Sequence, residues 1–339
     1  MTDPLPLPLG DNAAYALPLA EGGVLLVDAG PDIPGGEGSE GETDREGGTW
    51  GEALALLAAG GFAPGDVHVV LLTHWHLDHC GLAWRWAAEG ARILAGADDI
   101  EPIATGQPWN DARVETRLRT LIEHGCPPEL AARFRQPTRR RPPLYRWRAC
   151  PREAVKAVAD GAEFALEGGA SLRVVAAPGH TPGNLVGFVE ATGDLYSGDT
   201  LLPNTTPTPG LHFPAAADGA PGERWPSLPP FVASVERLRG LGVRRVLPGH
   251  GAPVEGEAAE RLFVRFERHH ARRSALVRGL LEERPDSAYG LVRRLFPHLP
   301  DARIAQALTE LIGQLDVLVA RGEAACEARD GVLVHRLTS

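Results

Sequence analysis

Short apolar runs bounded by turn-forming residues recur along most of this chain. The run at 67–72 is apolar at nearly every position, which is typical of a strand with both faces buried in a sheet. Similar runs predict strands at 23–28, 171–176, 185–189, 194–197 and 243–247. Helical repeats predict helices at 52–59, 81–88 and 112–124. The polar cluster that begins at residue 74 therefore sits at the end of a buried strand.

The spacing of apolar residues becomes mainly helical from about residue 256. It predicts an amphipathic helix over 258–282, two shorter helices over 288–296 and 302–321, and a two-stranded wing within 325–337. We therefore expect one larger domain over 1–255 and a small C-terminal domain over 256–339.

Residues 97–160 interrupt the series of strands with helical stretches and a basic, proline-rich segment, QPTRRRPPLYRWR. Connections of this length in a compact domain are usually lids or binding elements, so we expect a helical cap over the functional site. Trp109, Tyr145 and Trp147 are expected to shape its pocket. The arginines at 139–141 are interpreted as a solvated run rather than a grip for an anionic substrate. The competing interpretation is an insertion that packs away from the site.

Composition narrows the class of protein. Hydrophobic residues make up 43% of the 339 and charged residues 23%, as in globular domains, and the net charge of −10 argues against a general nucleic-acid-binding surface. The four cysteines form no Cys-x-x-Cys pair, which excludes a thiolate zinc site. The N-terminus lacks the features of a signal peptide, and no apolar stretch is long enough to span a membrane. A cytoplasmic protein is therefore expected.

Three imidazoles and one carboxylate crowd into residues 74–79, HWHLDH. Burying such a group is costly unless a cation sits among the side chains. Imidazole nitrogen and carboxylate oxygen suit zinc, and also iron or manganese. The alternative is a solvated loop that is merely rich in histidine. Matching residues further along the chain weigh against that alternative.

Three further polar residues stand beside glycine at the ends of predicted strands: His180 in PGHTPG, Asp199 in YSGDT and His250 in PGHG. Each alone would be interpreted as a packed or capping residue. Ligands on the ends of neighbouring strands converge, however, and two metal ions need roughly six to eight ligands with one bridging carboxylate. The candidate metal ligands are His74, His76, Asp78, His79, His180, Asp199 and His250.

These motifs, together with DAG at 28–30, resemble in sequence and order those of the metallo-β-lactamase superfamily. The likeness runs from about residue 12 to about residue 254 and is greatest to the glyoxalase-II-type hydrolases. It implies an α/β (α+β) fold, a four-layer αββα sandwich with two divalent metal ions at one edge of the sheets. Zinc is the first choice for both ions, with iron or manganese as alternatives.

The resemblance also implies a role for each ligand. His74, His76 and His180 would bind the first ion. Asp78, His79 and His250 would bind the second, and Asp199 would bridge the two. A metal-bound hydroxide would be the nucleophile, so Asp78 and Asp199 are the candidate catalytic side chains.

Departures from the family pattern narrow the set of reactions that the chain is expected to catalyse. Asp199 stands where true class B β-lactamases often carry cysteine, which argues against β-lactam hydrolysis. His76 stands where oxygen-reducing di-iron members carry glutamate. The tail lacks the clear basic pattern with which glyoxalase II holds glutathione. From residue 256 it loosely resembles the small winged-helix-like domain of some endoribonucleases and acyl-carrier thioesterases.

We therefore predict a dinuclear metal-dependent hydrolase of a carboxylic ester, thioester or lactone, with His212, Trp75 and Tyr145 as candidates for substrate contact. Three alternatives stay open: a phosphodiesterase or endoribonuclease, a mononuclear iron persulfide dioxygenase, and a non-catalytic DNA-binding regulator. The tail from residue 256 holds thirteen arginines against twelve acidic residues, which argues against nucleic acid. We expect a small-molecule substrate, no membrane contact, and a tail that buttresses the active-site edge or forms a homodimer interface.

Overall fold

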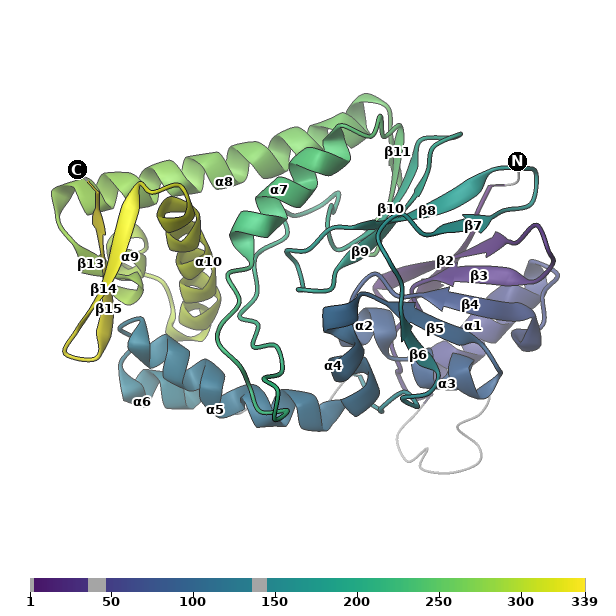
Figure 1. Cartoon of the computed structure of the whole chain (residues 1–339), viewed down its shortest axis with the longest axis horizontal. Coiled ribbons are helices and arrows are strands. Elements are labelled where there is room, and N and C mark those ends of the chain that lie inside the picture. The colour runs from purple at the N-terminus through teal and green to yellow at the C-terminus, as the bar shows by residue number, and fades with distance from the viewer. Residues whose placement is uncertain (1–2, 36–46, 136–144, 339) are drawn as a thin grey trace.

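Two six-stranded sheets face each other across a shared apolar core (Figure 1). The structure, a computed structural model, describes residues 3–35, 47–135 and 145–338. The first sheet has the order β1-β2-β3-β4-β5-β6, with strands Leu5–Leu9, Asn12–Pro18, Val24–Val27, Val67–Leu71, Arg92–Ala95 and Val155–Ala157. The second has the order β12-β11-β10-β9-β8-β7, with strands Val254–Glu255, Arg245–Pro248, Asp194–Gly198, Leu185–Val189, Ser171–Ala176 and Glu163–Ala165.

Strand β4 shows how the apolar pattern produces layers. Val69 and Leu71 lie in the core between the two sheets. Val67 and Val70 lie in a separate core under helices α1 (Gly48–Ala59) and α3 (Ala83–Ala88). Each fully buried valine or leucine contributes about 1.5–3 kcal/mol, so both faces of the strand stabilise the fold. The prediction of a strand buried on both faces is confirmed.

The outer face of the second sheet is covered by α7 (Leu228–Arg239) and by the first half of α8 (Glu257–Glu283). Phe231 of α7 and Phe266 of α8 are fully buried there, with ring centroids 4.9 Å apart. The layers are therefore helix, sheet, sheet and helix, as predicted for an α/β sandwich.

The second half of α8 leaves the sheets and joins a helical cluster at the opposite end of the molecule (Figure 1). The cluster holds α9 (Ala288–Leu295), α10 (Asp301–Ala320) and a small sheet of β13 (Asp286–Ser287), β15 (Val332–Leu337) and β14 (Ala324–Arg329). The three predicted helices and the hairpin are confirmed as elements. The winged-helix relationship and the boundary at 255/256 stay predictions, because α8 contributes to cores on both sides of that boundary.

The insertion forms α4 (Ile100–Thr105), α5 (Gln107–Glu123) and α6 (Pro128–Ala131). Leu121 and Leu130 at its far end belong to the same apolar core as Leu281 of α8, in the helical cluster. The predicted span of 97–160 without strands is wrong at its end, because β6 (Val155–Ala157) pairs with β5 at the edge of the first sheet. The arginines at 139–141 lie outside the described residues, as does the middle of the glycine-rich segment after β3.

Several elements had no clear sequence signal. Strand β1 carries two prolines, which suit the edge of a sheet and hide the strand from a propensity argument. Strands β2, β5 and β7 and helix α7 were not predicted either. The helix expected over 81–88 is α3, which begins at Ala83, and Asp78 lies before it in the first turn of a separate short helix, α2 (Leu77–Cys80).

Candidate metal centre

The seven candidate ligands lie at one edge of the two sheets, five in loops and two, Asp78 and His79, in the short helix α2. Residues 74–79 follow β4, Asp199 follows β10, and His250 follows β11, which runs parallel to β10. His180 lies in the loop that joins β8 to β9. The ends of neighbouring parallel strands meet at the same sheet edge, which is why residues far apart in sequence come together here.

Three imidazole nitrogens form the first group. His76 Nδ1 lies 3.0 Å from His74 Nε2 and 3.0 Å from His180 Nε2. An oxygen of Asp199 lies 3.5 Å from the same nitrogen of His180. Ligand atoms about 2.0–2.1 Å from a tetrahedral ion lie about 3.3 Å from one another. The spacing of these four side chains therefore fits one metal ion.

Asp78, His79 and His250 form the second group. His250 Nε2 lies 2.9 Å from Asp78 Oδ2, and His79 Nε2 lies 3.7 Å from the same oxygen. His79 is fully buried, whereas Asp78 and His250 are partly exposed. This group can hold a second ion that is open to solvent on one side.

Asp199 faces both groups, one oxygen to each. Its Oδ2 is the atom near His180, while its Oδ1 lies 3.3 Å from His79 Nε2 and 3.5 Å from His250 Nε2. A carboxylate in this position is suited to bridge two cations.

The outward nitrogens of three rings face oxygen acceptors. His79 Nδ1 lies 2.8 Å from Asp28 Oδ2, and His250 Nδ1 lies 2.6 Å from the backbone oxygen of Asp11. His74 Nδ1 lies 3.0 Å from Thr73 Oγ1, whose own proton has the Asp28 carboxylate as acceptor. Each ring therefore donates outward and keeps the lone pair of Nε2 for the interior, which is the arrangement that metal-binding histidines use. The residues present fit a divalent metal site.

The charges of the group are consistent with this arrangement. Burial, together with the neighbouring His79, lowers the pKa of His74 well below its usual range. Burial opposes the charged form of His79 as well, but Asp28 and Asp199 raise the pKa of this ring well above its usual range. Despite its own burial, Asp199 has a pKa held below the usual range, first by His79. The carboxylates thus make this pocket a place for positive charge.

Asp28 is a site residue to which the sequence analysis assigned no role, although its DAG motif was noted. It is buried at the end of β3 with φ of 64°, a conformation that aspartate and asparagine adopt more readily than most residues. Its second oxygen accepts from the backbone N–H of Thr73 at 2.8 Å. One carboxylate therefore fixes both the start of the 74–79 loop and the orientation of His79. A carboxylate directly after a buried strand was the available signal.

Asp99 positions the loop of His180 and was also missed. It is fully buried and accepts from Thr181 Oγ1 at 2.6 Å and from the backbone N–H of Gly183 at 2.9 Å. Burial raises its pKa to about 7. No sequence signal pointed to Asp99, because it lies in a short 3₁₀ turn after β5.

The three predicted substrate contacts lie around the centre. Trp75 stacks on Trp147 of the insertion, with ring centroids 5.5 Å apart. His212 is buried, and its Nε2 donates to the backbone oxygen of His180 at 2.8 Å, so it also supports the His180 loop. Tyr145 is partly buried, and burial together with the charge of Asp78 raises its pKa. Their contact with substrate stays a prediction.

A cavity of about 220 Å³ opens beside His76. Trp75, from the loop after β4, and His212, from the loop after β10, line it. Trp109, Arg113 and Arg117 of α5 line it as well. The near end of the insertion thus reaches the centre, as a lid would, while its far end packs in the helical cluster.

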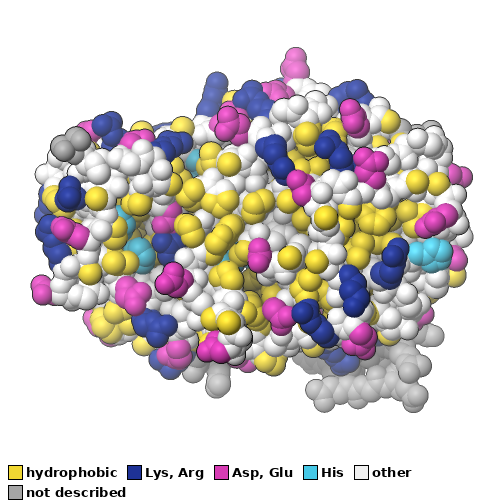
Figure 2. All heavy atoms as spheres, in the orientation of Figure 1, with side chains coloured by type: hydrophobic (Ala, Val, Ile, Leu, Met, Phe, Trp, Pro, Cys, Tyr) yellow, Lys and Arg dark blue, Asp and Glu magenta, His cyan; other side chains and the backbone are white. Residues whose placement is uncertain are grey.

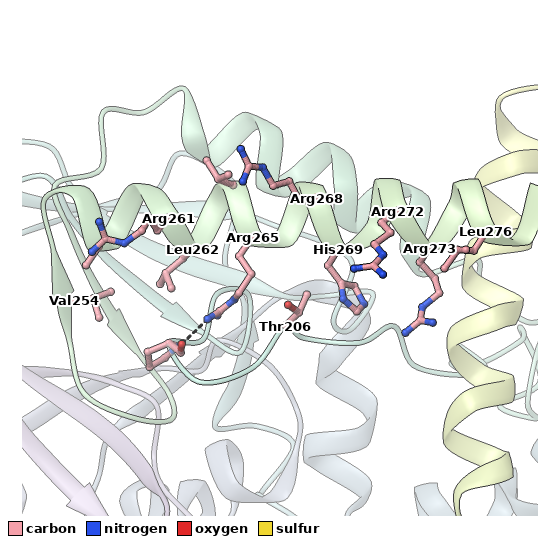
Figure 3. A pocket seen from close by; sticks show the side chains of 13 residues that line it. Thr206, Val254, Arg261, Leu262, Arg265, Arg268, His269, Arg272, Arg273 and Leu276 are labelled. Carbon is pink, nitrogen blue, oxygen red and sulfur yellow. Dashed lines mark hydrogen bonds between the residues drawn. The ribbon is translucent and has the colours of Figure 1, made fainter. Parts of the chain in front are cut away.

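A second, larger cavity of about 900 Å³ runs along α8 and holds none of the seven candidate ligands. Figure 3 shows Arg265, His269 and Arg273 on the side of α8 that faces Thr206. Arg265 donates to the backbone oxygens of Pro203 and Thr205, in the loop that follows Asp199. The cavity therefore concentrates arginines of the tail on one face of a helix.

Elsewhere the surface shows no such concentration on the face that Figure 2 presents, where basic and acidic side chains are interspersed. None of the helices in the described part of the chain is both long and apolar enough to cross a membrane.

Comparisons with known proteins agree with this geometry. Residues 9–250 match the family described as "Metallo-beta-lactamase superfamily". "Probable metallo-hydrolase YqjP" from Bacillus subtilis (strain 168) is 30% identical over 324 residues, which cover 94% of this chain and 90% of that protein. "Atrochrysone carboxyl ACP thioesterase" from Aspergillus fumigatus is 26% identical over 61% of this chain and 44% of that protein. The crystal structure of a metallo-beta-lactamase family protein from Thermus thermophilus matches with a TM-score of 0.69 at 26% identity, covering 99% of this chain and 98% of that one.

Proposed function

The chain belongs to the metallo-beta-lactamase superfamily and is a metallo-hydrolase, and from this premise we propose that it cleaves a carboxylic ester, thioester or lactone with two divalent metal ions. Zinc is the first choice for both ions, with iron or manganese as alternatives. The observation that carries the proposal is Asp199, which turns one oxygen to each of two ligand groups. The thioesterase among the relatives supports thioesters as one substrate class.

The residues have separate tasks. His74, His76 and His180 would hold one ion, and Asp78, His79 and His250 the other. Two bound divalent ions would lower the pKa of water to supply a nucleophile near neutral pH and would polarise the carbonyl oxygen. Asp28 holds His79 in the tautomer that offers Nε2 inward. Trp75 and His212 would exclude water from one side of the substrate.

The second ligand group separates this proposal from a mononuclear iron dioxygenase, which needs only two histidines and one aspartate. Asp78, His79 and His250 converge as closely as the first group does, and a mononuclear site would leave them without a role. Asp78→Ala should therefore lose one ion per chain and reduce kcat/KM for the best ester or thioester by at least about 100-fold, because the second cation is needed for charge stabilisation. Elemental analysis and steady-state kinetics measure both quantities. Full activity with one ion would contradict the dinuclear proposal.

One observation favours a phosphodiesterase as the second candidate. The arginine-lined cavity of α8 borders the loop that follows Asp199 and could hold a phosphate-bearing substrate (Figure 3). A panel of esters, thioesters, lactones and bis-aryl phosphates, assayed on protein of known metal content, separates the two candidates. Turnover of the bis-aryl phosphates alone would replace the ester proposal by the second candidate.

The charge of the tail bears on what the protein binds. We propose a small-molecule substrate rather than nucleic acid. The balanced charge of the tail supports this proposal, whereas the arginines of α8 are the feature that argues against it. We also propose a glyoxalase-II-like metal site, a winged-helix-like tail and a homodimer formed through the tail. Measurement of the mass of the protein in solution tests the homodimer.

A further inference from the structure

Arg113 is a buried arginine, and one nitrogen of its guanidinium lacks a hydrogen-bond partner. Its side chain is 3% exposed, although it belongs to the helix α5 that lines the cavity beside His76. Its Nε donates to the backbone oxygen of Phe213 at 2.7 Å, and its Nη1 donates to that of Trp109 at 3.1 Å. Its Nη2 has no hydrogen-bond partner. A buried donor without a partner costs about 1–3 kcal/mol, and more when it is charged.

The guanidinium of Arg113 lies over the ring of Trp109, 3.0 Å from its centroid, but no described carboxylate pairs with it. Among the described residues, neither Arg113 nor Arg117 forms an ion pair with a carboxylate. Arg117 donates instead to the backbone and side-chain oxygens of Asn110. Asp98 is the one acidic residue that lines the cavity, and it is exposed. Two guanidinium groups therefore share this wall of the cavity, and the charge of Asp111 acts on Arg117 without forming an ion pair with it.

The protein keeps this charge at a cost. Burial, with the nearby Arg117, lowers the pKa of Arg113 to about 10, which still leaves it protonated at neutral pH. A structural clamp between α5 and the loop of Phe213 uses only two of the five N–H groups of the guanidinium. The ring of Trp109 stabilises part of this charge, while no described carboxylate is paired with it, so an anion in the adjoining cavity would complete its environment.

We propose that the cavity binds an oxyanion of the substrate, a carboxylate or a phosphate, beside the guanidinium groups of Arg113 and Arg117. Arg117 supplies a second positive charge, and the rings of Trp75 and Trp109 form the walls. Because His76 lines the same cavity, the anionic group lies on a part of the substrate next to the scissile bond. The inference rests on the proposed hydrolase function and names its substrate class: an ester or thioester with a negatively charged acyl chain.

Matched substrates test the preference. The 4-nitrophenyl monoester of glutarate carries a carboxylate at the end of its acyl chain, whereas 4-nitrophenyl pentanoate has a similar length and no charge. The metal-loaded wild-type protein should prefer the glutarate ester in kcat/KM by at least about tenfold, as expected for one charge-assisted hydrogen bond. Arg113→Gln should lower kcat/KM for the glutarate ester by about 30-fold or more and for the pentanoate ester by less than about threefold. Arg117→Gln should act in the same direction with a smaller effect.

Arg119→Gln is the matched control, because Arg119 lies on the same helix, is 67% exposed and faces Glu123. It should leave both esters unaffected. Arg113→Lys separates folding from recognition, since lysine keeps the charge but not the fixed fork of donors. It should recover part of the preference lost in Arg113→Gln, and the thermal midpoint of each variant shows whether the fold persists.

Calorimetric titration supplies a readout that does not depend on turnover. Glutarate, inorganic phosphate and the neutral glutaramide are titrated into the metal-loaded wild-type protein, Arg113→Gln and Arg119→Gln. At least one of the two anions should bind at least tenfold more tightly than glutaramide, and only Arg113→Gln should remove the difference. Glutarate as the tighter ligand assigns a carboxylate, and phosphate as the tighter ligand assigns a phosphate.

The outcomes separate this inference from the function on which it rests. Equal hydrolysis of both esters, with equal losses in Arg113→Gln, would overturn the anion site and leave the hydrolase proposal intact. Absence of all ester, thioester and lactone hydrolysis would refute the proposed function, and the titrations would then decide the anion site alone. Binding of both anions unchanged in Arg113→Gln overturns the inference in either case.

Discussion

Replacement of Asp28 by asparagine tests whether a buried carboxylate holds His79 in the orientation needed for a metal ion. Asp28 is 2% exposed, and its Oδ2 lies 2.8 Å from His79 Nδ1. Asparagine has the same shape and tolerates the φ of 64° at this position, so the substitution changes the charge and one donor rather than the backbone. The amide oxygen can still accept from the N–H of Thr73.

The consequence for His79 follows from its two nitrogens. The carboxylate of Asp28 accepts only, so Nδ1 must carry the proton and Nε2 keeps its lone pair. In Asp28→Asn an NH2 group faces Nδ1 and favours the tautomer with the proton on Nε2, the atom that lies 3.3 Å from Asp199 Oδ1. Loss of such a partner of a metal-binding histidine typically reduces metal affinity by about 10–100-fold, equivalent to about 1.4–2.7 kcal/mol.

Competition with a chelator of known affinity measures this effect. The more weakly held ion of Asp28→Asn should dissociate at a free chelator concentration lower by that factor, while the more tightly held ion changes less. Asp32→Asn is the control, because Asp32 is equally buried at 2% exposure but accepts from Trp84 Nε1 and contacts no candidate ligand. Equal affinities for both ions in the wild type and in Asp28→Asn would refute the tautomer argument.

Three further outcomes are expected. Gly249→Ala would place a Cβ 2.4 Å from His79 Cε1, so it should displace the second ion, which elemental analysis detects, with little loss of secondary structure by circular dichroism. Deletion of 256–339 would uncover Phe231 and its neighbours on α7, so the shortened chain should aggregate in light-scattering assays. Any soluble fraction should retain metal. Complete loss of metal would show that the tail contributes to the site. Asp99 has a folded-state pKa of about 7, above its value in the unfolded chain, so its contribution to stability is present below about pH 4 and is lost as pH rises through about 7. The free energy of unfolding of the wild type, relative to Asp99→Asn, should therefore fall by about 1–4 kcal/mol between pH 4 and pH 8 in urea titrations, and a difference that rises with pH would contradict the burial argument.

The ligands could be predicted from the sequence because they follow buried strands, either crowded into residues 74–79 or, for His180, Asp199 and His250, beside glycine. The run at 67–72 and the residues after it are local signals, and the strand is buried on both faces as the run indicated. The supporting residues gave weaker signals. Asp99 is 81 residues from His180 in sequence and acts on its loop through Thr181 and Gly183, a pairing set only by the packing of the two sheets. Arg113 resembles any other arginine of an amphipathic helix until the loop of Phe213 covers it.

The position of the insertion relative to the candidate metal centre could not be predicted from local sequence patterns. Its helix α5 has Trp109 and Arg113 at one end, beside the candidate metal centre, and Leu121 at the other end, in the core of the helical cluster. The orientation of the first end therefore depends on how the second end is packed, and that end shares an apolar core with Leu281 and Leu308 of the tail. A cavity mutation such as Leu308→Ala, which costs about 2–5 kcal/mol, acts on the anchored end of α5 without touching the centre. We therefore expect the tail to affect substrate preference through the packing of a single helix, and Leu308→Ala should reduce the preference for the glutarate ester while the metal content stays unchanged.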